Sequence, residues 1–334
     1  MKILMYIRHD YQENIAGDSI LVIKTKEYLI QAGMKVAVSS NPNEDLKKYD
    51  LVHLFNTINV LDTYKFFINA MKYKKKVVLT PIYWNYVKYL PNTFTNALKA
   101  SYWQKYDPLR KEVFKGVDLL LPSSESEMRE IEKNFNINLP YKVVFNGVDK
   151  TFAEGNANDF LKQLQIENFV LSVGRISPHK NQLTLAKVTK KLGVPLVLVG
   201  PINDLNYYHQ CMKINKDILY IPKINHSSLK AIYAAAKVHA LISWYEIPGL
   251  VSLEAALGKC NIVTTKEGST KEYFKDFAVY VDPYDLEEIE NKVLESLKKS
   301  FNTDFKKYIL EKFLWEKVVE KLISCYTYVT KVNG

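Results

Sequence analysis

The sequence predicts an α/β protein made of two doubly wound domains, each built on a parallel sheet. Short apolar runs of strand length alternate with segments of helical periodicity along the whole chain of 334 residues. A turn and a polar stretch over 146–159 interrupt this alternation, which then resumes. A chain of this length is also too long for one hydrophobic core and suits two. We therefore expect one domain on each side of residue 149.

In the first half, strands are predicted at 2–7, 36–39, 51–55, 76–80, 117–121 and 141–145. Helices are predicted between them, at 20–31, at 60–71, from about 92 to 115 and from 124 onwards. Strands joined through helices run parallel, because the crossover brings the chain back to the same edge of the sheet. The pair Asn146-Gly147 suits positive backbone angles and ends this pattern.

The second half repeats the alternation, with strands predicted at 169–173, 196–199, 218–221, 238–242 and 261–264. A second parallel sheet follows from this spacing. The last segment, from about 303 to 329, has helical periodicity and comes after that sheet is complete. It is expected to pack back across the cleft between the two domains.

The composition excludes several classes of protein. Apolar residues make up 47% and charged residues 25% of the chain, as in globular proteins. No apolar run approaches the roughly 18 residues of a spanning helix, and the N-terminus lacks a signal-peptide core, so we expect a cytoplasmic protein. The three cysteines have neither zinc-site nor disulfide spacing. The net charge is +10 but no nucleic-acid-binding signature is present, so no nucleic-acid partner is expected.

One basic cluster has two interpretations. It consists of Lys72, Lys74, Lys75 and Lys76, next to Tyr73. The cluster suits contact with anionic lipid headgroups, and it equally suits a solvated helix end before a strand. The solvated interpretation is favoured.

Ligands of open α/β sheets bind beyond the carboxyl ends of the strands. The strand at 169–173 leads into Gly174 and Arg175, with Lys180 five residues further on. The planar fork of arginine and the point charge of lysine suit a phosphate group, and they would stabilise the charge that develops as a diphosphate departs. In the alternative interpretation, Arg175 pairs with a nearby carboxylate and Lys180 only begins a helix.

The strand at 238–242 leads into a turn with Pro248 and Gly249, near which a helix is predicted to begin. The unpaired amides of a helix N-terminus favour an anion such as a diphosphate. Glu246 precedes this point and Glu254 lies about a turn and a half beyond it. Carboxylates accept hydrogen bonds from hydroxyls, so sugar hydroxyls are their expected targets. Alternatively, Glu254 is a solvated partner of the helix dipole.

Taken together, these motifs resemble glycosyltransferase family 4, a retaining family of GT-B fold. The matching residues are Gly174-Arg175, Lys180, Glu246, Glu254, Asn146-Gly147-Val148-Asp149 and Trp315-Glu316-Lys317-Val318. The resemblance spans nearly the whole chain. It implies an acceptor-side domain over 1–149, a donor-binding domain over 150–313, and a helix at about 314–334 that crosses back to the first domain.

The resemblance also implies roles for single residues. Arg175 and Lys180 would grip the donor diphosphate, Glu246 would meet the hydroxyls of the transferred sugar, and Glu254 would meet the ribose. Further donor contacts are expected at Gly174, at the backbone of Pro248, Gly249, Leu250 and Val251, and at Lys223 and Ile224 beside the base.

In the first half, the loop that ends in Gly17 and Asp18 resembles the glycine-rich donor loop of the family. Ala16 stands in place of its first glycine, which makes close approach of the backbone to the donor less assured. An ordinary helix cap is the alternative interpretation of Gly17 and Asp18.

Four residues are candidates for the acceptor side. Tyr83, Trp84 and Asn85 stand where many members of the family carry a histidine, and they would form a stacking and hydrogen-bonding wall for a sugar. Core packing is the alternative for Trp84. His9, at the end of the first strand, is a candidate for acceptor contact or for a structural role.

These inferences predict a retaining glycosyltransferase that moves a hexose-type sugar from a UDP- or GDP-sugar to a glycan or a lipid-linked oligosaccharide. By family analogy the product is a bacterial surface polysaccharide such as O-antigen or capsule, made at the inner face of the plasma membrane. No cofactor is expected, and no paired-Asp motif predicts a metal site. A non-catalytic nucleotide-sugar-binding partner and a nucleotide-sugar epimerase of the same fold are the alternatives. No Gly-x-Gly-x-x-Gly follows the first strand, which argues against a dinucleotide oxidoreductase.

Overall fold

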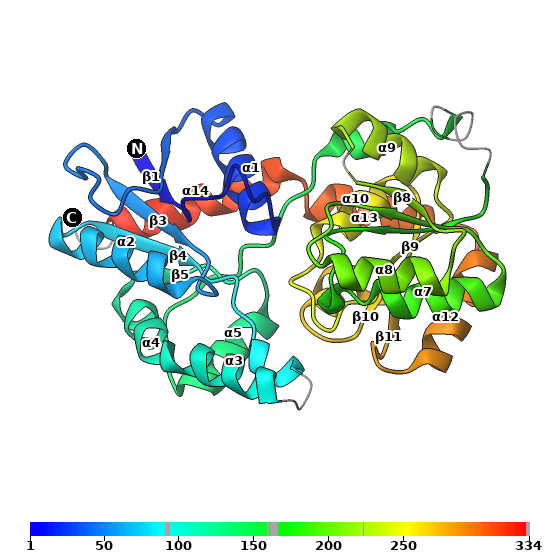
Figure 1. The fold of residues 1–334 in the computed structure, drawn as a ribbon. Helices are drawn as coiled ribbons and strands as arrows, with labels where there is room; N and C mark the ends of the chain where they lie inside the picture. Colours follow the sequence, from blue (N-terminus) through cyan, green and yellow to red (C-terminus); the bar gives the residue numbers. More distant parts are fainter. Residues whose placement is uncertain (91–93, 159, 161–165, 223, 332–334) are drawn as a thin grey trace. The chain divides into compact units, whose positions relative to one another are not determined.

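The computed structural model describes residues 1–90, 94–158, 160, 166–222 and 224–331. The chain forms two compact units, Met1–Gly147 with Trp315–Gly334 and Val148–Leu314 (Figure 1). This division lies two residues before the boundary predicted from the sequence. Within the described residues, no helix is both long and apolar enough to span a membrane.

The first unit is built on a parallel sheet in the order β2-β1-β3-β4-β5. Its strands are β1 (Lys2–Tyr6), β2 (Lys35–Ser39), β3 (Leu51–Phe55), β4 (Lys76–Thr80) and β5 (Leu119–Leu120). Each strand is short and mostly apolar, as expected for strands that are covered on both faces.

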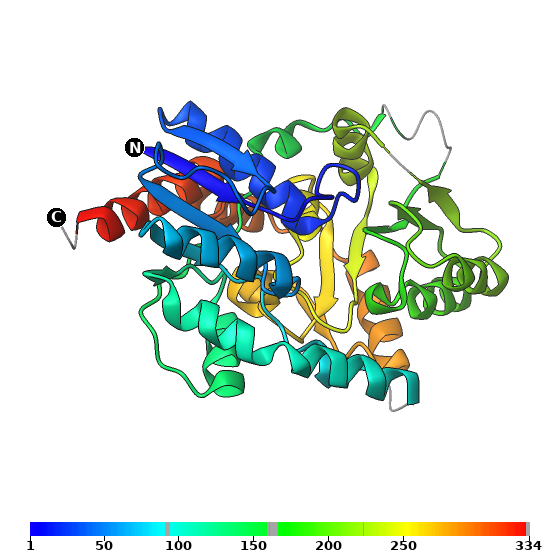
Figure 2. The same ribbon diagram turned by 60° about the vertical axis from the view of Figure 1, so that its left-hand side comes forward.

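Helices cover both faces of this sheet. Their bounds are α1 (Gly17–Gln31), α2 (Val60–Lys72), α3 (Phe94–Lys105), α4 (Asp107–Gly116), α5 (Glu125–Phe135), α14 (Trp315–Lys331) and the 3-10 helix η1 (Tyr86–Tyr89). Successive side chains of a strand point to opposite faces. Ile3 and Met5 therefore pack with α1 and α14, whereas Leu4 and Tyr6 pack with α2, α4 and α5. Helix α14 lies beside α1 in both views, so the end of the chain completes the core of the first unit (Figure 2).

The second unit has a parallel sheet in the order β11-β10-β9-β6-β7-β8. Its strands are β6 (Val170–Val173), β7 (Leu196–Val199), β8 (Leu219–Ile221), β9 (Val238–Leu241), β10 (Asn261–Thr265) and β11 (Val279–Val281). Helices α7 (Gln182–Leu192), α8 (Leu205–Ile214) and α12 (Leu286–Lys298) pack on one face of this sheet. The other face carries α9 (His226–Ala235), α10 (Leu250–Leu257) and α13 (Thr303–Lys312). The remaining elements are η2 (Lys150–Glu154), η3 (Pro178–Lys180), α11 (Thr270–Phe274) and η4 (Lys275–Phe277).

Two predicted helices are each split in two. The segment at 92–115 forms α3 and α4, because Pro108 lies in the first turn of α4 and lacks the N–H that would continue the hydrogen bonds of α3. The segment at 303–329 forms α13 and α14. Between them, Phe313 O accepts a hydrogen bond from Val148 N at 2.8 Å. This carbonyl therefore bonds to the first residue of the second unit.

Two predictions about strands are wrong. The run at 141–145 forms only an isolated bridge between Tyr141 and Leu120. Pro140 and Pro122 flank this bridge on its two sides and lack the N–H groups that a longer ladder needs. The edge strand β11 was missed, because its three residues are too few to show a period.

Candidate functional site

The strand order of the second unit has a topological switch point between β6 and β9. These strands are neighbours, but the chain leaves β6 towards β7 and β8 and leaves β9 towards β10 and β11. The connections after the two strands diverge, and open α/β sheets bind ligands at such a point. The loops that follow β6 and β9 are residues 174–181 and 242–249, the same two segments that the sequence singles out.

The loop after β6 is held from within the second unit. Gly174 has a φ of 150°, and a side chain at the neighbouring Gly200 would place its Cβ 2.3 Å from Gly174 O. Asn181 adopts a left-handed conformation, and its amide donates to Ile242 O at 3.2 Å and to Pro283 O at 2.7 Å. Sequence reasoning missed Asn181, whose tolerance of a left-handed conformation between two helical segments is the available signal.

Arg175 is exposed, and its guanidinium has no hydrogen-bond or ion-pair partner within the described part of the chain. It is also the only arginine in the sequence of 148–314. The backbone of Arg175 is fixed, because its carbonyl oxygen accepts from Gln182 Nε2 at 2.9 Å. The structure therefore does not bear out the alternative in which Arg175 pairs with a nearby carboxylate.

Lys180 and His179 add further contacts between the loops after β6 and β9. Lys180 Nζ lies 2.5 Å from Glu246 Oε1, and the Glu246 side chain is only 6% exposed. One residue earlier, His179 Nε2 donates to Tyr245 O at 3.1 Å. Burial lowers the pKa of His179 to about 4, so its ring is neutral near pH 7. The structure thus brings together Lys180 and Glu246, which the sequence placed in separate motifs.

The backbone of Glu246 is fixed by the loop after β10. Glu246 N donates to Glu267 O at 3.3 Å, and Ser269 N donates to Glu246 O at 3.0 Å. Gly268 lies between these two contacts with a φ of 97°, and a Cβ there would stand 2.1 Å from Glu246 O. Sequence reasoning missed this loop, although a glycine shortly after a strand was a usable signal.

Helix α10 begins at Leu250, close to the predicted start, and Gly249 is its N-cap with a φ of 80°. No side chain of the described residues caps this end. Ser252 N donates to Gly249 O at 2.9 Å, which leaves the amides of Leu250 and Val251 in the first turn for a ligand. Four residues later, Glu254 Oε2 accepts a hydrogen bond from the hydroxyl of the buried Tyr233 at 2.9 Å. Tyr233 holds the carboxylate in place and was missed from the sequence. Pro248 is buried and Val251 is half-buried.

In the first unit, the carboxylate of Asp18 belongs to a buried hydrogen-bond network. Arg8 Nε contacts Asp18 Oδ2 at 2.9 Å, and Asn56 Nδ2 donates to the same oxygen at 2.8 Å. Burial alone would raise the pKa of Asp18, but these hydrogen bonds outweigh it and hold that pKa below its usual value. Gly17 beside it is exposed, and a Cβ added there would meet no atom within 4 Å other than those of its chain neighbours and its own helix. Sequence reasoning missed Arg8, although an arginine at the end of an apolar strand was a signal.

The acceptor-side candidates have different surroundings. Tyr83 is 2% exposed, and its ring packs edge-on against Phe114 and Phe135. The expectation that Tyr83 lines a sugar is therefore corrected: its aromatic ring fills the core of the first unit. Trp84 and Asn85 are half-buried.

The remaining predicted residues are less constrained. The side chain of His9 is 80% exposed and lies 3.9 Å from Asp62. Lys223 lies outside the described residues, and Ile224 is half-buried. Among the residues that the structure describes, no group of three or more His, Cys, Asp or Glu side chains is placed to hold a metal ion.

Comparison with known proteins extends this description. Residues 157–312 match the model of the family Glycosyl transferases group 1. An uncharacterized glycosyltransferase of Methanocaldococcus jannaschii is 22% identical over 218 residues, in an alignment that covers 58% of this chain and 55% of that protein. An uncharacterized 41.2 kDa protein in the cps region of Klebsiella pneumoniae is 24% identical over 245 residues, 69% of this chain and 63% of that protein. The alignments thus span less than two thirds of these relatives.

Solved structures match over nearly the whole chain. Sucrose-phosphate synthase from Thermosynechococcus elongatus has a TM-score of 0.81 at 16% identity, covering 98% of this chain and 99% of the other. Anabaena HepE, solved in complex with UDP and glucose, has a TM-score of 0.75 at 17% identity with the same coverage. Residues 157–312 thus match Glycosyl transferases group 1, which supports a glycosyltransferase, and the chain folds as two Rossmann-like domains of the GT-B type.

Proposed function

We propose that the protein is a retaining glycosyltransferase that moves a hexose-type sugar from a UDP- or GDP-sugar to a glycan or a lipid-linked oligosaccharide, without a metal or another cofactor. The observation that carries the proposal is the contact between Lys180 and Glu246, in a loop where Arg175 has no partner among the described residues. Lys180 follows β6 and Glu246 follows β9, and these two strands are neighbours in the sheet of the second unit.

The positive groups suit a diphosphate. Arg175 offers a planar fork, Lys180 offers a point charge, and the amides at the start of α10 add a helix N-terminus. Three such groups on one edge of a sheet would hold a dianionic ligand and stabilise the charge that it gains on departure.

The carboxylates suit hydroxyl groups. In a nucleotide sugar, the diphosphate is bonded directly to the sugar, so a cation for phosphate and an acceptor for sugar hydroxyls must lie side by side. The 2.5 Å contact between Lys180 and Glu246 meets this requirement before any ligand binds. Glu254, oriented by Tyr233 further along α10, is the candidate for the ribose hydroxyls.

The transfer itself needs few protein groups. The bond between the anomeric carbon and the phosphate oxygen breaks, and its electron pair leaves with the nucleoside diphosphate towards Arg175 and Lys180. The acceptor hydroxyl forms the new bond on the same face and gives its proton to the departing phosphate oxygen. The role of the protein is to position both substrates and to stabilise the leaving charge.

The biological setting is proposed from the relatives. The Klebsiella relative is a protein of the cps region, and the Anabaena structure contains UDP and glucose. By analogy we propose a role in bacterial surface polysaccharide synthesis at the inner face of the plasma membrane. The base of the donor is left as uridine or guanosine, because the backbone groups expected to contact it carry no residue code.

The test is donor turnover. The purified protein is incubated with UDP-, GDP- and ADP-sugars in the presence of a chelator, and nucleoside diphosphate release is measured with and without a glycan acceptor. We expect release from one donor class, and a loss of about a hundredfold or more in Arg175→Ala and in Lys180→Ala. Lys187→Ala, an exposed lysine on α7, is the matched control and should keep wild-type turnover. Unchanged turnover in both site variants would refute the proposal.

A further inference from the structure

Helix α3 is the least covered helix of the first unit. None of the residues 96–105 is buried, although the helix is rich in apolar and aromatic side chains. Leu98 is 57% exposed and Tyr102 is 61% exposed. These two residues are four positions apart, so they share one face of the helix. An exposed leucine and tyrosine on one face indicate a contact surface.

The side of α3 that carries Trp103 is firmly attached. The Arg110 guanidinium stacks over the Trp103 ring at 3.8 Å, and Arg110 Nη1 donates to Trp103 O at 2.9 Å. The Tyr86 ring lies 5.8 Å from the Trp103 ring. Because these contacts hold the helix from one side, Leu98 and Tyr102 are presented on a fixed frame.

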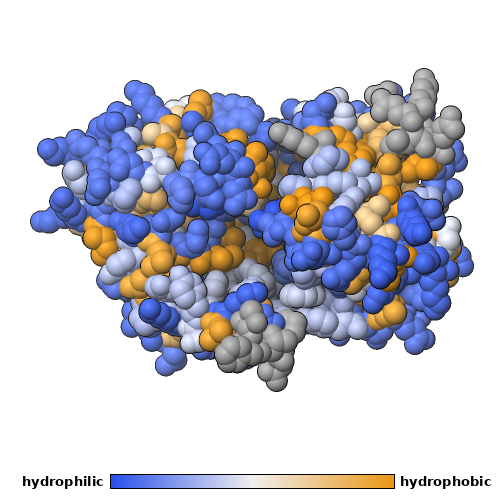
Figure 3. All heavy atoms as spheres, in the orientation of Figure 1, coloured by the Kyte–Doolittle hydropathy of each residue, from blue (hydrophilic) through white to orange (hydrophobic). Residues whose placement is uncertain are grey.

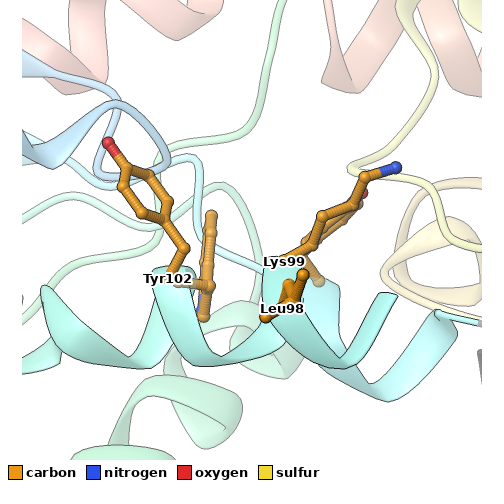
Figure 4. A pocket seen from close by; sticks show the side chains of 5 residues that line it. Leu98, Lys99 and Tyr102 are labelled. Carbon is orange, nitrogen blue, oxygen red and sulfur yellow. The ribbon is translucent and has the colours of Figure 1, made fainter. Parts of the chain in front are cut away.

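The exposed face contains an apolar hollow. Its volume is about 500 Å³, and it is lined by Tyr86, Leu98, Lys99, Tyr102 and Trp103. Figure 4 shows Tyr102 and Lys99 projecting from the same side of the helix, with the amine of Lys99 at the far end of its stem. A lysine of this kind keeps its stem on apolar surface and its charge in a polar layer.

The charged residues in the sequence of this segment have one sign. From Trp84 to Tyr106 the sequence contains Lys88, Lys99 and Lys105 and no aspartate or glutamate. The next acidic residue, Asp107, is paired with Arg110 at 2.8 Å. Tyrosine and tryptophan favour the boundary between water and acyl chains, and lysines favour anionic headgroups. Figure 3 shows several apolar areas between polar ones on the visible face of the first unit (Figure 3).

We propose that the exposed face of α3 docks on an anionic lipid bilayer, with Leu98 and Tyr102 at the headgroup boundary and Lys99 and Lys105 facing the phosphates. The proposal deepens the proposed function by giving the acceptor side a lipid surface. It rests on the first unit alone and does not require the donor site.

The lysine cluster at 72–76 is a poorer candidate for the same contact. Lys75 Nζ donates to Tyr49 O at 2.7 Å, and Lys76 pairs with Asp118 at 2.9 Å. Two of its four lysines are therefore occupied within the first unit. Lys72 and Lys74 are exposed, as the solvated interpretation expects, whereas Lys75 and Lys76 are half-buried.

The test is sedimentation of the full-length protein with vesicles. One set of vesicles contains phosphatidylglycerol with phosphatidylcholine, and the other contains phosphatidylcholine alone. The main variant is the pair Leu98→Ser and Tyr102→Ser. The matched control is the pair Leu61→Ser and Ile68→Ser on α2, whose native side chains are 40% and 45% exposed. A third variant, Lys99→Gln with Lys105→Gln, tests the charge.

We expect binding to the anionic vesicles only, weakened at least tenfold by the α3 pair and unchanged by the α2 pair. The lysine variant should bind more weakly and depend less on salt. Failure of the wild-type protein to bind anionic vesicles, or equal binding by the α3 pair, overturns the proposal, and equal binding to neutral vesicles overturns the assignment to anionic lipid. Stabilisation by UDP or GDP is measured on the same samples, so loss of the donor site and loss of the lipid surface are distinguished.

Discussion

Lys180 Nζ lies 2.5 Å from Glu246 Oε1, although 66 positions separate the two residues in the chain. The pair forms because β6 and β9 are neighbours in the sheet and their following loops meet at one edge. The Glu246 side chain is 6% exposed and the Lys180 side chain 20%, so the pair is largely shielded from water. Such a pair keeps both groups oriented before a ligand arrives.

The strength of this pair is measurable by a double-mutant cycle. We expect Lys180→Met, Glu246→Gln and the double variant to give a coupling free energy of about 1–3 kcal/mol in thermal or chemical unfolding of the second unit. Removing one partner leaves the other charge poorly solvated, which is the source of the coupling.

Lys191 and Glu290 provide the matched control for the cycle. Their contact is 2.7 Å long, but the Lys191 side chain is 71% exposed. Water screens this pair, so its coupling should stay below about 1 kcal/mol. Equal coupling energies for the two pairs would contradict the assigned role of burial at Lys180 and Glu246.

Tyr233→Phe removes the hydroxyl that donates to Glu254 Oε2 while keeping the aromatic ring. If Glu254 binds the ribose, its loss of orientation should raise the KM for the donor several-fold and change kcat less. Steady-state nucleoside diphosphate release at varied donor concentration gives both constants. Tyr280→Phe, which removes a hydroxyl bonded to Lys275 O on the surface, should change neither.

Gly268→Ala tests the loop that holds Glu246. The added Cβ would lie 2.1 Å from Glu246 O, so the backbone of Glu246 must move. We expect at least a tenfold loss of turnover together with a lower Tm of the second unit. Gly193→Ala also places a side chain at positive φ, 65°, but with no atom within 4 Å. It should cost about 1–2 kcal/mol of stability and leave turnover unchanged. A similar effect of both variants on turnover would argue against the positioning role.

Three histidines whose pKa is lowered by burial make stability depend on pH: His179, described above, and two that are fully buried. Burial lowers the pKa of His53, in the first unit, and of His239, in the second, to about 3. In the unfolded chain both rings titrate near 6.5, so the unfolded state binds more protons between pH 6.5 and about 3. Stability is fully present above pH 6.5 and falls as the pH decreases, by at most about 1.4 kcal/mol per pH unit for each histidine.

The pH slope is measured from the unfolding free energy of each unit between pH 5 and 7. His53→Gln should remove the contribution of that ring from the slope of the first unit, where buried Glu127, with its pKa raised to about 7, contributes in the opposite direction. His239→Gln should reduce the slope of the second unit. His9→Gln, on a side chain that is 80% exposed, is the matched control for the first unit. A slope that stays the same in the His53 and His239 variants would contradict the argument.

Much of the fold could be predicted because local patterns determine it. The runs at 51–55, 76–80 and 196–199 are strands with the predicted bounds, since buried parallel strands are continuous apolar segments. The predictions that were wrong concern where helices and strands are interrupted or are very short. Pro108 divides one predicted helix, prolines at 122 and 140 limit a strand, and three residues are too few to reveal β11.

The candidate site was only partly predictable, for a related reason. Arg175, Lys180, Glu246 and Glu254 carry charges at recognisable spacings after strands. The residues that hold them act through tertiary contacts: Asn181 bonds to carbonyls of two other segments, and Tyr233 reaches Glu254 from α9. The wrong prediction for Tyr83 has the same cause. The sequence around a tyrosine that follows a strand does not differ between one that faces a ligand and one that fills a core.

We propose that the loops after β6 and β9 bind the diphosphate of a nucleotide sugar through Arg175. The most direct measurement is calorimetric titration with UDP and GDP, and with the corresponding nucleosides, in chelator-containing buffer. The wild-type protein is compared with Arg175→Ala and with Lys187→Ala. We expect one of the two diphosphates to bind and its nucleoside to bind far more weakly. Of the two variants, only Arg175→Ala should weaken binding of the diphosphate, by tenfold or more. Equal affinity of Arg175→Ala and wild type, or no binding of either diphosphate, would contradict it.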